Sequence, residues 1–459
     1  MFGVATTAIL TRLLAPAEYG LYALGLSIVF FVTIGVFEWI GLSLLRLAPT
    51  ARDPERFFGT LVTCFLALCG VTVLGAAVIL VLGGLGQYLA LTAACLPTAF
   101  AAAWFELNQR LQLADLREKE FFRASLSRGL LTCITVPLVA YLTRSASLTV
   151  LVLGLSFLVA VLPVREPRLK LYRCRFDAEL CRSLLRFGVP LSVSVSLATM
   201  LMSIDKWMLQ GLSGVQAVGF FSAATFVAQV PITTLAGGIG SSAYSMAVRA
   251  VEFSSRAAAA RKLAQNFVVL FGIIVPAGVG VISVSENLAH VMVGPSYWRS
   301  VVVLTPLLSG VAMLSGIRGF YVDTAFQLAH KTAPLIATTA FGLILNIALD
   351  FWLIPQMAEL GAAIASFVAS FACLVLATVL SRRFFRLPIP YLDAVKIMSS
   401  AAIMYWFLRE LDHGSGALAL VAQILAGSVV YFGGLITLKV SGVREALAEV
   451  LAGAGSAEG

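Results

Sequence analysis

The feature that most constrains this chain is a series of apolar segments, each close to the length of a membrane-spanning helix. A helix of ~20 apolar residues crosses the hydrocarbon core of a bilayer. Fourteen such segments can be marked, at residues 1–14 (short), 20–45, 57–82, 87–109, 121–143, 147–164, 184–211, 217–247, 263–285, 300–325, 332–354, 359–381, 393–409 and 415–438. A backbone in lipid has to satisfy its own hydrogen bonds, so the sequence predicts an all-α polytopic membrane protein.

The composition excludes most soluble classes. Charged residues make up 12% of the chain, against about 25% in a typical soluble domain. The longest polar stretch is 165–183, which leaves no room for a soluble catalytic domain. The net charge of +9 falls largely in short loops, so we expect no nucleic-acid partner. The seven cysteines lie mostly inside apolar segments and form no CxxC motif, so no metal site is predicted.

The distribution of lysine and arginine predicts the orientation. With the N-terminus inside, 26 of the 32 fall in inner loops or adjoining helix ends and four fall outside. Basic residues favour the cytoplasmic side of a membrane protein. Both termini are therefore predicted to be cytoplasmic. One miscounted helix would invert every later loop, so the bias also supports fourteen crossings.

An internal repeat relates two halves of the chain. LLAPAEYGLYAL (Leu13–Leu24) aligns with LSGVQAVGFFSA (Leu212–Ala223) at an offset of 199, which pairs Gly20 with Gly219. Helices one to six precede the basic 165–183 segment, and helices seven to twelve, the second repeat, follow it. Since six is even, both halves enter the membrane in the same direction. This predicts two parallel six-helix lobes, related by a pseudo-two-fold axis along the membrane normal, with a central cavity suited to a transporter.

The repeat also gives predicted boundaries. They are an N-terminal lobe at 1–164, a basic cytoplasmic linker at 165–183, a second lobe at 184–385, two additional transmembrane helices at 386–438 and a cytoplasmic tail at 439–459. At this offset Met1 falls opposite the middle of the 184–211 helix. We therefore expect the first helix to be truncated, through a misassigned start or a fragment.

Four stretches carry a resemblance to a known family. They are RLLAPAEYGLYAL (Arg12–Leu24), FEWIGLSLLR (Phe37–Arg46), LLRFGVPLSVS…IDKWML (Leu184–Leu209) and LILNIALDFWLIPQMAELGAAIAS (Leu343–Ser366). In order and spacing the chain resembles the oligosaccharide flippases, the polysaccharide-transporter branch of the superfamily that also holds multidrug and toxin extrusion pumps and lipid II flippases. The resemblance runs from residue 12 to about residue 385.

The resemblance implies a function. Fourteen helices favour the flippase branch over the drug pumps, which usually have twelve. A member would move a polyprenyl pyrophosphate-linked oligosaccharide from the inner to the outer leaflet for surface polysaccharide biosynthesis. We would then expect a monomer in a bacterial or archaeal plasma membrane, working with other polysaccharide-assembly proteins.

Ionisable residues inside predicted spans are functional hypotheses by default, because burying charge in lipid is costly. A pyrophosphate group needs fixed cations, and arginine offers bidentate contacts. The predicted cavity cations are Arg128, Arg318, Lys206 and Arg46. Alternatives remain: Arg46 as an inner-leaflet anchor, Arg128 snorkelling to the interface, and Asp205–Lys206 as a local stop signal together with a lobe-to-lobe ion pair. Arg318 and Asp323 are five residues apart, a poor spacing for an α-helical ion pair, so each is expected to meet another helix.

Coupling to H⁺ or Na⁺ would use a buried carboxylate, and a sugar needs hydrogen-bonding or stacking groups. The ion-coupling candidates are Asp205, Glu38, Asp350, Glu106 and Asp323, and the sugar-contact candidates are Asn108, Gln109, Asn346 and Trp207. No cofactor, metal or catalytic residue is predicted.

Two other functions compete with the flippase hypothesis. A cation-coupled drug exporter would share the fold but need a less cationic cavity. A membrane-embedded glycosyltransferase or polymerase would need an acidic or metal-binding motif beside a sizeable outer loop. The longest outer gap has about fifteen residues and carries Glu286 and His290 without paired carboxylates.

Overall fold

The computed structural model describes residues 2–48, 53–83, 86–164, 176–253, 256–329, 331, 333–385, 387–411 and 416–440, and these residues are helical with short connections. By contacts the chain divides into two compact units, Met1–Gly219 and Phe220–Gly459. Residues 441–459 of the predicted tail and residues 165–175 of the predicted linker lie outside the described residues.

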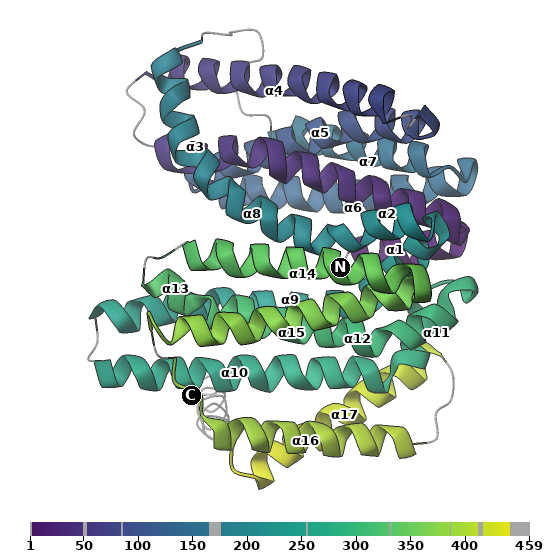
Figure 1. The fold of residues 1–459 in the computed structure, drawn as a ribbon, viewed down its shortest axis with the longest axis vertical. Coiled ribbons are helices and arrows are strands. Elements are labelled where there is room, and N and C mark those ends of the chain that lie inside the picture. The colour runs from purple at the N-terminus through teal and green to yellow at the C-terminus, as the bar shows by residue number, and fades with distance from the viewer. Residues whose placement is uncertain are drawn as a thin grey trace, which may run out of the picture. The chain divides into compact units, whose positions relative to one another are not determined.

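The first unit consists of antiparallel helices joined by short turns (Figure 1). Its elements are α1 (Phe2–Leu13), α2 (Pro16–Val32), the π-helix η1 (Thr33–Phe37), α3 (Glu38–Leu47), α4 (Pro54–Leu82), the 3₁₀ turn η3 (Gly86–Tyr88), α5 (Leu89–Ala114), α6 (Glu118–Thr143), α7 (Ala146–Val161), the 3₁₀ turn η4 (Leu162–Val164) and α8 (Ala178–Leu212).

The second unit is built in the same way and carries the two C-terminal helices. Its elements are α9 (Val215–Phe253, whose first turn belongs to the first unit), α10 (Arg256–Ser283), α11 (Ser285–Met292), η5 (Pro295–Tyr297), α12 (Trp298–Ile317), the π-helix η6 (Arg318–Val322), α13 (Thr324–Leu328), α14 (Ala333–Met357), α15 (Glu359–Ser381), α16 (Tyr391–Glu410) and α17 (Ala417–Thr437).

The fourteen predicted segments all coincide with helices among the described residues. Ten helical segments are long and apolar enough to cross a membrane. Of the other four, α1 and α7 are short, with 12 and 16 residues. Helix α8 is bent by 51° between its Ala178–Pro190 and Val195–Leu212 parts, and α16 carries charged residues near both ends. The prediction of an all-α multi-pass membrane protein is confirmed, whereas fourteen crossings stay a prediction.

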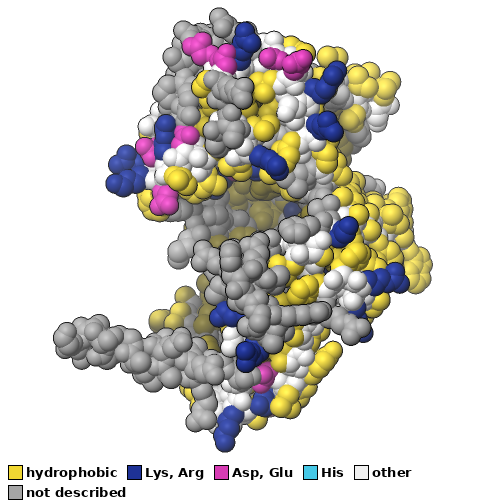
Figure 2. All heavy atoms as spheres, turned by 90° about the vertical axis from the view of Figure 1, so that its left-hand side faces the viewer, with side chains coloured by type: hydrophobic (Ala, Val, Ile, Leu, Met, Phe, Trp, Pro, Cys, Tyr) yellow, Lys and Arg dark blue, Asp and Glu magenta, His cyan; other side chains and the backbone are white. Residues whose placement is uncertain are grey.

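The surfaces of the helices suit a lipid environment. Large apolar side chains on α4 and α17 are exposed, including Leu74, Val81, Leu82 and Leu418. Figure 2 looks onto the face at the left of Figure 1, where lysine and arginine side chains appear in each unit and apolar side chains lie along the flanks. Such exposure would be unfavourable in water and is expected where the solvent is hydrocarbon.

The repeat offset of 199 reappears as a contact in space. A side chain at Gly20 would collide with the carbonyl oxygen of Val215, and one at Gly219 would collide with that of Pro16. Pro16 and Val215 are themselves 199 residues apart, so the contact is reciprocal, as at a two-fold axis. The first turns of α2 and α9 therefore meet backbone to backbone, which supports the aligned repeat.

Helix α8 packs within the first unit, although the repeat places it at the start of the second lobe. The Ser43 hydroxyl of α3 donates to the Leu184 carbonyl of α8 at 2.8 Å. Gly188 lies against the Trp39 carbonyl, where a side chain would collide. This close approach needs a glycine on α8. Because α8 packs against α3, the boundary between the two compact units falls after α8, one helix later than the predicted linker. The lobe boundaries derived from the repeat remain a prediction.

Candidate functional site

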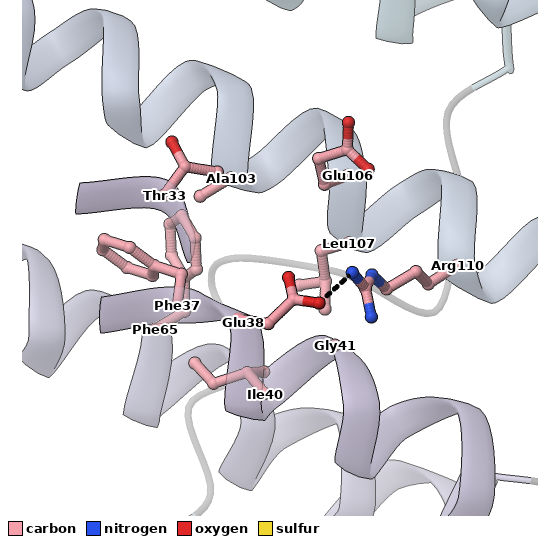
Figure 3. A pocket seen from close by; sticks show the side chains of 10 residues that line it. All are labelled: Thr33, Phe37, Glu38, Ile40, Gly41, Phe65, Ala103, Glu106, Leu107 and Arg110. Carbon is pink, nitrogen blue, oxygen red and sulfur yellow. Dashed lines mark hydrogen bonds and ion pairs between the residues drawn. The ribbon is translucent and has the colours of Figure 1, made fainter. Parts of the chain in front are cut away.

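An ion pair inside the first unit forms the core of one candidate site. Glu38 is the first residue of α3, and Arg110 lies near the end of α5. The Arg110 Nη2 and Glu38 Oε1 atoms are 2.6 Å apart, and the two side chains are only 20% and 14% exposed. Figure 3 shows the two groups pointing toward one another from facing helices. A guanidinium–carboxylate hydrogen bond of this length is among the stronger polar contacts in proteins.

Two local features of helix α3 and its neighbour η1 place this pair. The π-helical turn Thr33–Phe37 ends immediately before Glu38, so its extra residue sets the direction of the Glu38 side chain. Gly41 lies one turn after Glu38, and a Cβ there would be only 2.6 Å from the Arg110 Cδ. The guanidinium therefore reaches Glu38 across a surface that only glycine leaves open.

A small pocket surrounds the pair. It has a volume of about 20 Å³ and is lined by Thr33, Phe37, Glu38, Ile40, Gly41, Phe65, Ala103, Glu106, Leu107 and Arg110. This volume accommodates one water-sized group. Glu106 lies one turn before Arg110 on α5 and directs its carboxylate away from the pair (Figure 3). One guanidinium and two carboxylates thus line the same pocket, and the carboxylates outnumber the cation.

A second ion pair lies inside the second unit. The Arg318 Nε and Asp323 Oδ2 atoms are 3.5 Å apart, and each side chain is 13% exposed. The Arg318 Nη2 also donates to the Thr339 hydroxyl of α14 at 2.6 Å. Because Arg318 begins η6 and Asp323 directly follows it, the pair brackets a π-helical turn.

This second pair corrects one sequence prediction. On an α-helix, residues five apart point about 140° apart, so Arg318 and Asp323 were expected to meet other helices. The structure has a π turn here, in which the Asp323 amide donates to the Arg318 carbonyl at 2.8 Å. An i→i+5 bond stacks residue i+5 over residue i. The expectation was wrong for Asp323, while Arg318 does also reach another helix through Thr339.

Comparison with known proteins shows the family to which this chain belongs. The sequence profile of a family described as "Polysaccharide biosynthesis protein" matches residues 9–303, well over half of the 459-residue chain. The chain belongs to this polysaccharide biosynthesis protein family. Comparison with curated protein sequences gives no significant match.

Solved structures show the fold of this family member. It is similar to the lipid II flippase MurJ in an inward closed conformation, with a TM-score of 0.77 and 15% identity over 95% of this chain and 96% of that one. An inward-facing MATE multidrug resistance transporter of the MOP superfamily gives 0.60 and 16%, over 83% and 93%. A MOP superfamily transporter from Pyrococcus furiosus gives 0.54 and 15%, over 83% and 91%. The protein therefore has the fold of the MOP superfamily, and the resemblance seen in the sequence is confirmed.

Two of the predicted cavity cations of this family member contact aromatic rings. The Arg46 guanidinium at the end of α3 lies 4.6 Å from the centroid of the Phe187 ring on α8. Arg128 on α6 lies 5.3 Å from the Phe105 ring and 5.4 Å from the Phe157 ring. These are cation–π distances, so both arginines help to pack helices of the first unit. Their predicted role in binding phosphate stays a prediction.

The predicted residues at the end of α8 lie in mixed surroundings. Asp205 is buried, whereas Lys206 and Trp207 are partly buried. The Trp207 ring meets the Phe31 ring edge-on at 5.1 Å between centroids. Its Nε1 has no hydrogen-bond partner in the described part of the chain. An indole whose N–H has no partner could donate a hydrogen bond to a sugar. The sugar-contact role of Trp207 stays a prediction.

The predicted amide side chains already have protein partners. The Gln109 Nε2 donates to the Ser125 hydroxyl at 2.9 Å, and the Asn108 Nδ2 donates to the Trp104 carbonyl at 2.8 Å. On α14 the Asn346 Nδ2 donates to the Asp350 Oδ2 at 3.0 Å, and both residues are fully buried. A sugar would have to replace these bonds or share the remaining lone pairs and protons.

Sequence reasoning missed Arg110 as a site residue. It appeared as one of several basic residues near an inner helix end, where an anchoring role is the simplest interpretation. The π turns at Thr33–Phe37 and Arg318–Val322 leave no recognisable sequence signal either. The only available signal was Glu38 itself, an acidic residue inside an apolar segment that requires a cationic partner.

Proposed function

We propose that this protein moves a polyprenyl pyrophosphate-linked oligosaccharide from the inner to the outer leaflet for surface polysaccharide biosynthesis. Family membership supports the polysaccharide pathway. The similarity to a lipid II flippase over 95% of the chain, against 83% for the multidrug transporter, supports a lipid-linked substrate. The parallel repeat supports alternating access as the mechanism.

The observation that carries this proposal is the Arg110–Glu38 pair in its pocket. A guanidinium in a low-dielectric site binds phosphate oxygens strongly and in a bidentate manner. In this structure the Glu38 carboxylate forms an ion pair with the Arg110 guanidinium. The pocket holds only a water-sized group in this structure, so a phosphate can bind Arg110 only after Glu38 releases the guanidinium and the pocket widens. Protonation or cation binding at Glu38 would release it. The same pair would then couple substrate binding to H⁺ or Na⁺.

A groove in the second unit suits the lipid tail. Its volume is about 430 Å³, and α10, α16 and α17 supply most of its apolar lining, including Pro276, Met404 and Phe432. Gly272 and Gly427 also line it, and Gly427 lets α17 pack closely against Leu408 of α16. Helices α16 and α17 are the two additional C-terminal helices of the predicted architecture. We propose that the groove accommodates part of the polyprenyl chain.

The proposed setting follows from charge and composition. We propose a bacterial or archaeal plasma membrane with both termini in the cytoplasm, because the basic residues gather in the loops assigned to that side. We also propose that the protein acts as a monomer alongside other polysaccharide-assembly proteins.

A leaflet-translocation assay tests the function. The purified protein is reconstituted in liposomes with a polyprenyl pyrophosphate that carries a short oligosaccharide and a fluorophore on the sugar. A membrane-impermeant quencher then measures the labelled sugar that reaches the outer leaflet. We expect translocation by the native protein, a loss of at least tenfold in Arg110→Gln, and normal rates in the exposed control Arg123→Gln.

The same vesicles separate the competing functions. A drug exporter would move a lipophilic cation such as ethidium and leave the labelled lipid in place, and that result would overturn the flippase proposal. A pH gradient and a Na⁺ gradient are then imposed in turn on the native protein and on Glu38→Gln. We expect one gradient to accelerate the native protein and neither to accelerate the variant. Equal acceleration of both proteins would remove Glu38 from the coupling step.

A further inference from the structure

We infer that Asp323 is the internal counter-ion that a phosphate must displace from Arg318, and that this exchange is linked to the π-helical turn between the two residues. The inference rests on the proposed function, since it takes a lipid pyrophosphate as the substrate. It adds a positioning residue, Asp323, and a mechanical consequence of substrate binding.

The pair and the turn depend on one another. In the π form, residues 318 and 323 are stacked, and the Arg318 Nε and Asp323 Oδ2 atoms lie 3.5 Å apart. In an α-helix the same residues would point about 140° apart and could not pair. Each charge therefore stabilises the π turn, and the loss of the pair removes the electrostatic support for it.

The pair is incompletely satisfied, which points to a ligand. The Arg318 Nε and the Asp323 Oδ1 are buried and have no hydrogen-bond partner in the part of the chain that the structure describes. Buried polar atoms of this kind are rare and call for an explanation such as a missing ligand. An incoming phosphate oxygen would satisfy the guanidinium better than a carboxylate at 3.5 Å. The Thr339 hydroxyl already accepts a hydrogen bond from the Arg318 Nη2, which holds the guanidinium in place.

The helix after the turn is positioned to respond. Tyr321 within η6 donates its hydroxyl to the Pro388 carbonyl in the loop before α16. Tyr321 and Val322 also line a cavity of about 390 Å³ with residues of α15 and of that loop. Relaxation of a π turn shifts the following residues by one position, which is a rotation of about 100° and a rise of about 1.5 Å. The cavity leaves room for this shift of Tyr321.

Two variants separate the charge exchange from the turn. Asp323→Asn removes the counter-ion and keeps Arg318. Deletion of Gly319, whose surroundings are open, takes one residue out of the turn, so that Arg318 and Asp323 become four apart and can pair on an ordinary α-helix. Glu359→Gln is the matched control, because it removes one carboxylate from a helix start in the same unit.

The readouts are affinity, transport and backbone exchange. Inorganic pyrophosphate is titrated into the full-length protein in detergent, and the labelled lipid is followed in liposomes. We expect Asp323→Asn to bind pyrophosphate about tenfold more tightly yet to transport at least fivefold more slowly, because release is impaired. The Gly319 deletion should bind pyrophosphate but transport poorly. Hydrogen exchange over residues 318–328 should rise with pyrophosphate in the native protein and stay constant in the deletion.

The outcomes are distinguishable from a failure of the proposed function. If the native protein does not move the labelled lipid, the proposed function fails whatever happens at η6. If the native protein transports normally while Asp323→Asn matches Glu359→Gln in affinity and rate, the inference is wrong and the function stands. A parallel fall of affinity and transport in Asp323→Asn would assign the residue a merely structural role and would also overturn the inference.

Discussion

The Glu38–Arg110 pair allows a quantitative test by a double-mutant cycle. Glu38→Gln keeps the shape of the side chain but leaves the Arg110 guanidinium without its anionic partner. Breaking a fully buried pair costs about 3–5 kcal/mol, whereas an exposed pair contributes about 0–1 kcal/mol. The side chains are 14% and 20% exposed and 2.6 Å apart at their closest atoms. We therefore expect each single substitution, Glu38→Gln or Arg110→Gln, to cost about 2 kcal/mol.

The cycle predicts strong non-additivity. The double variant has neither charge, so it should lose about 2 kcal/mol rather than 4. The first unit has 219 residues, and an unfolding entropy of about 2.1 cal/mol/K per residue converts 2 kcal/mol into about 4 °C of Tm. Tryptophan fluorescence during thermal unfolding of the protein in detergent measures this shift. Glu118→Gln and Arg123→Gln, both exposed, form the matched control cycle.

Two results would refute the reasoning. If the double variant loses as much as the two single variants together, the charges are not coupled and the contact has no energetic role. If the single variants unfold within 1 °C of the controls, on the same scale of about 2 °C per kcal/mol, the pocket is far more hydrated than its burial indicates. In either case Glu38 would no longer be a sound candidate for coupling.

Three further predictions concern packing and the backbone. Gly154→Leu should lower the free energy of unfolding by about 3 kcal/mol, because a side chain there meets the backbone of α5. The control Gly75→Leu has open space around it and should leave Tm unchanged. Equal Tm values for the two variants would contradict this packing. A thiol oxidant should join Cys64 to Cys181, whose Sγ atoms are 3.5 Å apart, and intact-mass analysis should show the loss of two hydrogens, which Cys64→Ser should prevent. Ala358 has φ 48° and ψ −125°, a region that favours glycine, so Ala358→Gly should raise stability by about 1 kcal/mol, and a lower Tm would argue against backbone strain at this position.

The apolar segments and the glycine positions show how much could be predicted from the sequence. The fourteen segments coincide with helices because a chain in lipid has few alternatives to helical hydrogen bonding. The offset of 199 pairs Gly20 with Gly219, and the structure brings these glycines into reciprocal backbone contact. Here a local pattern was sufficient, because close approach of two backbones requires the absence of a side chain.

The partners of the charged residues could not be predicted from the sequence. Glu38 and Arg318 were identified as costly charges within spans, but their partners could not be deduced. Arg110 is 72 residues from Glu38 in the chain, so only the packing of α3 against α5 brings the two together. Asp323 was expected to contact another helix, because an α-helical period would turn it away from Arg318.

The sequence by itself determined that this protein is a helical membrane protein built from a parallel repeat, since hydropathy and the charge of the loops act locally along the chain. Only the tertiary structure decided which embedded charges neutralise each other and that α8 packs within the first unit. These outcomes depend on small departures from regular geometry. The glycines at positions 41 and 188 allow close contacts between helices, and the extra residue in each π turn changes the direction of the side chains beside it. Hydropathy does not predict either feature.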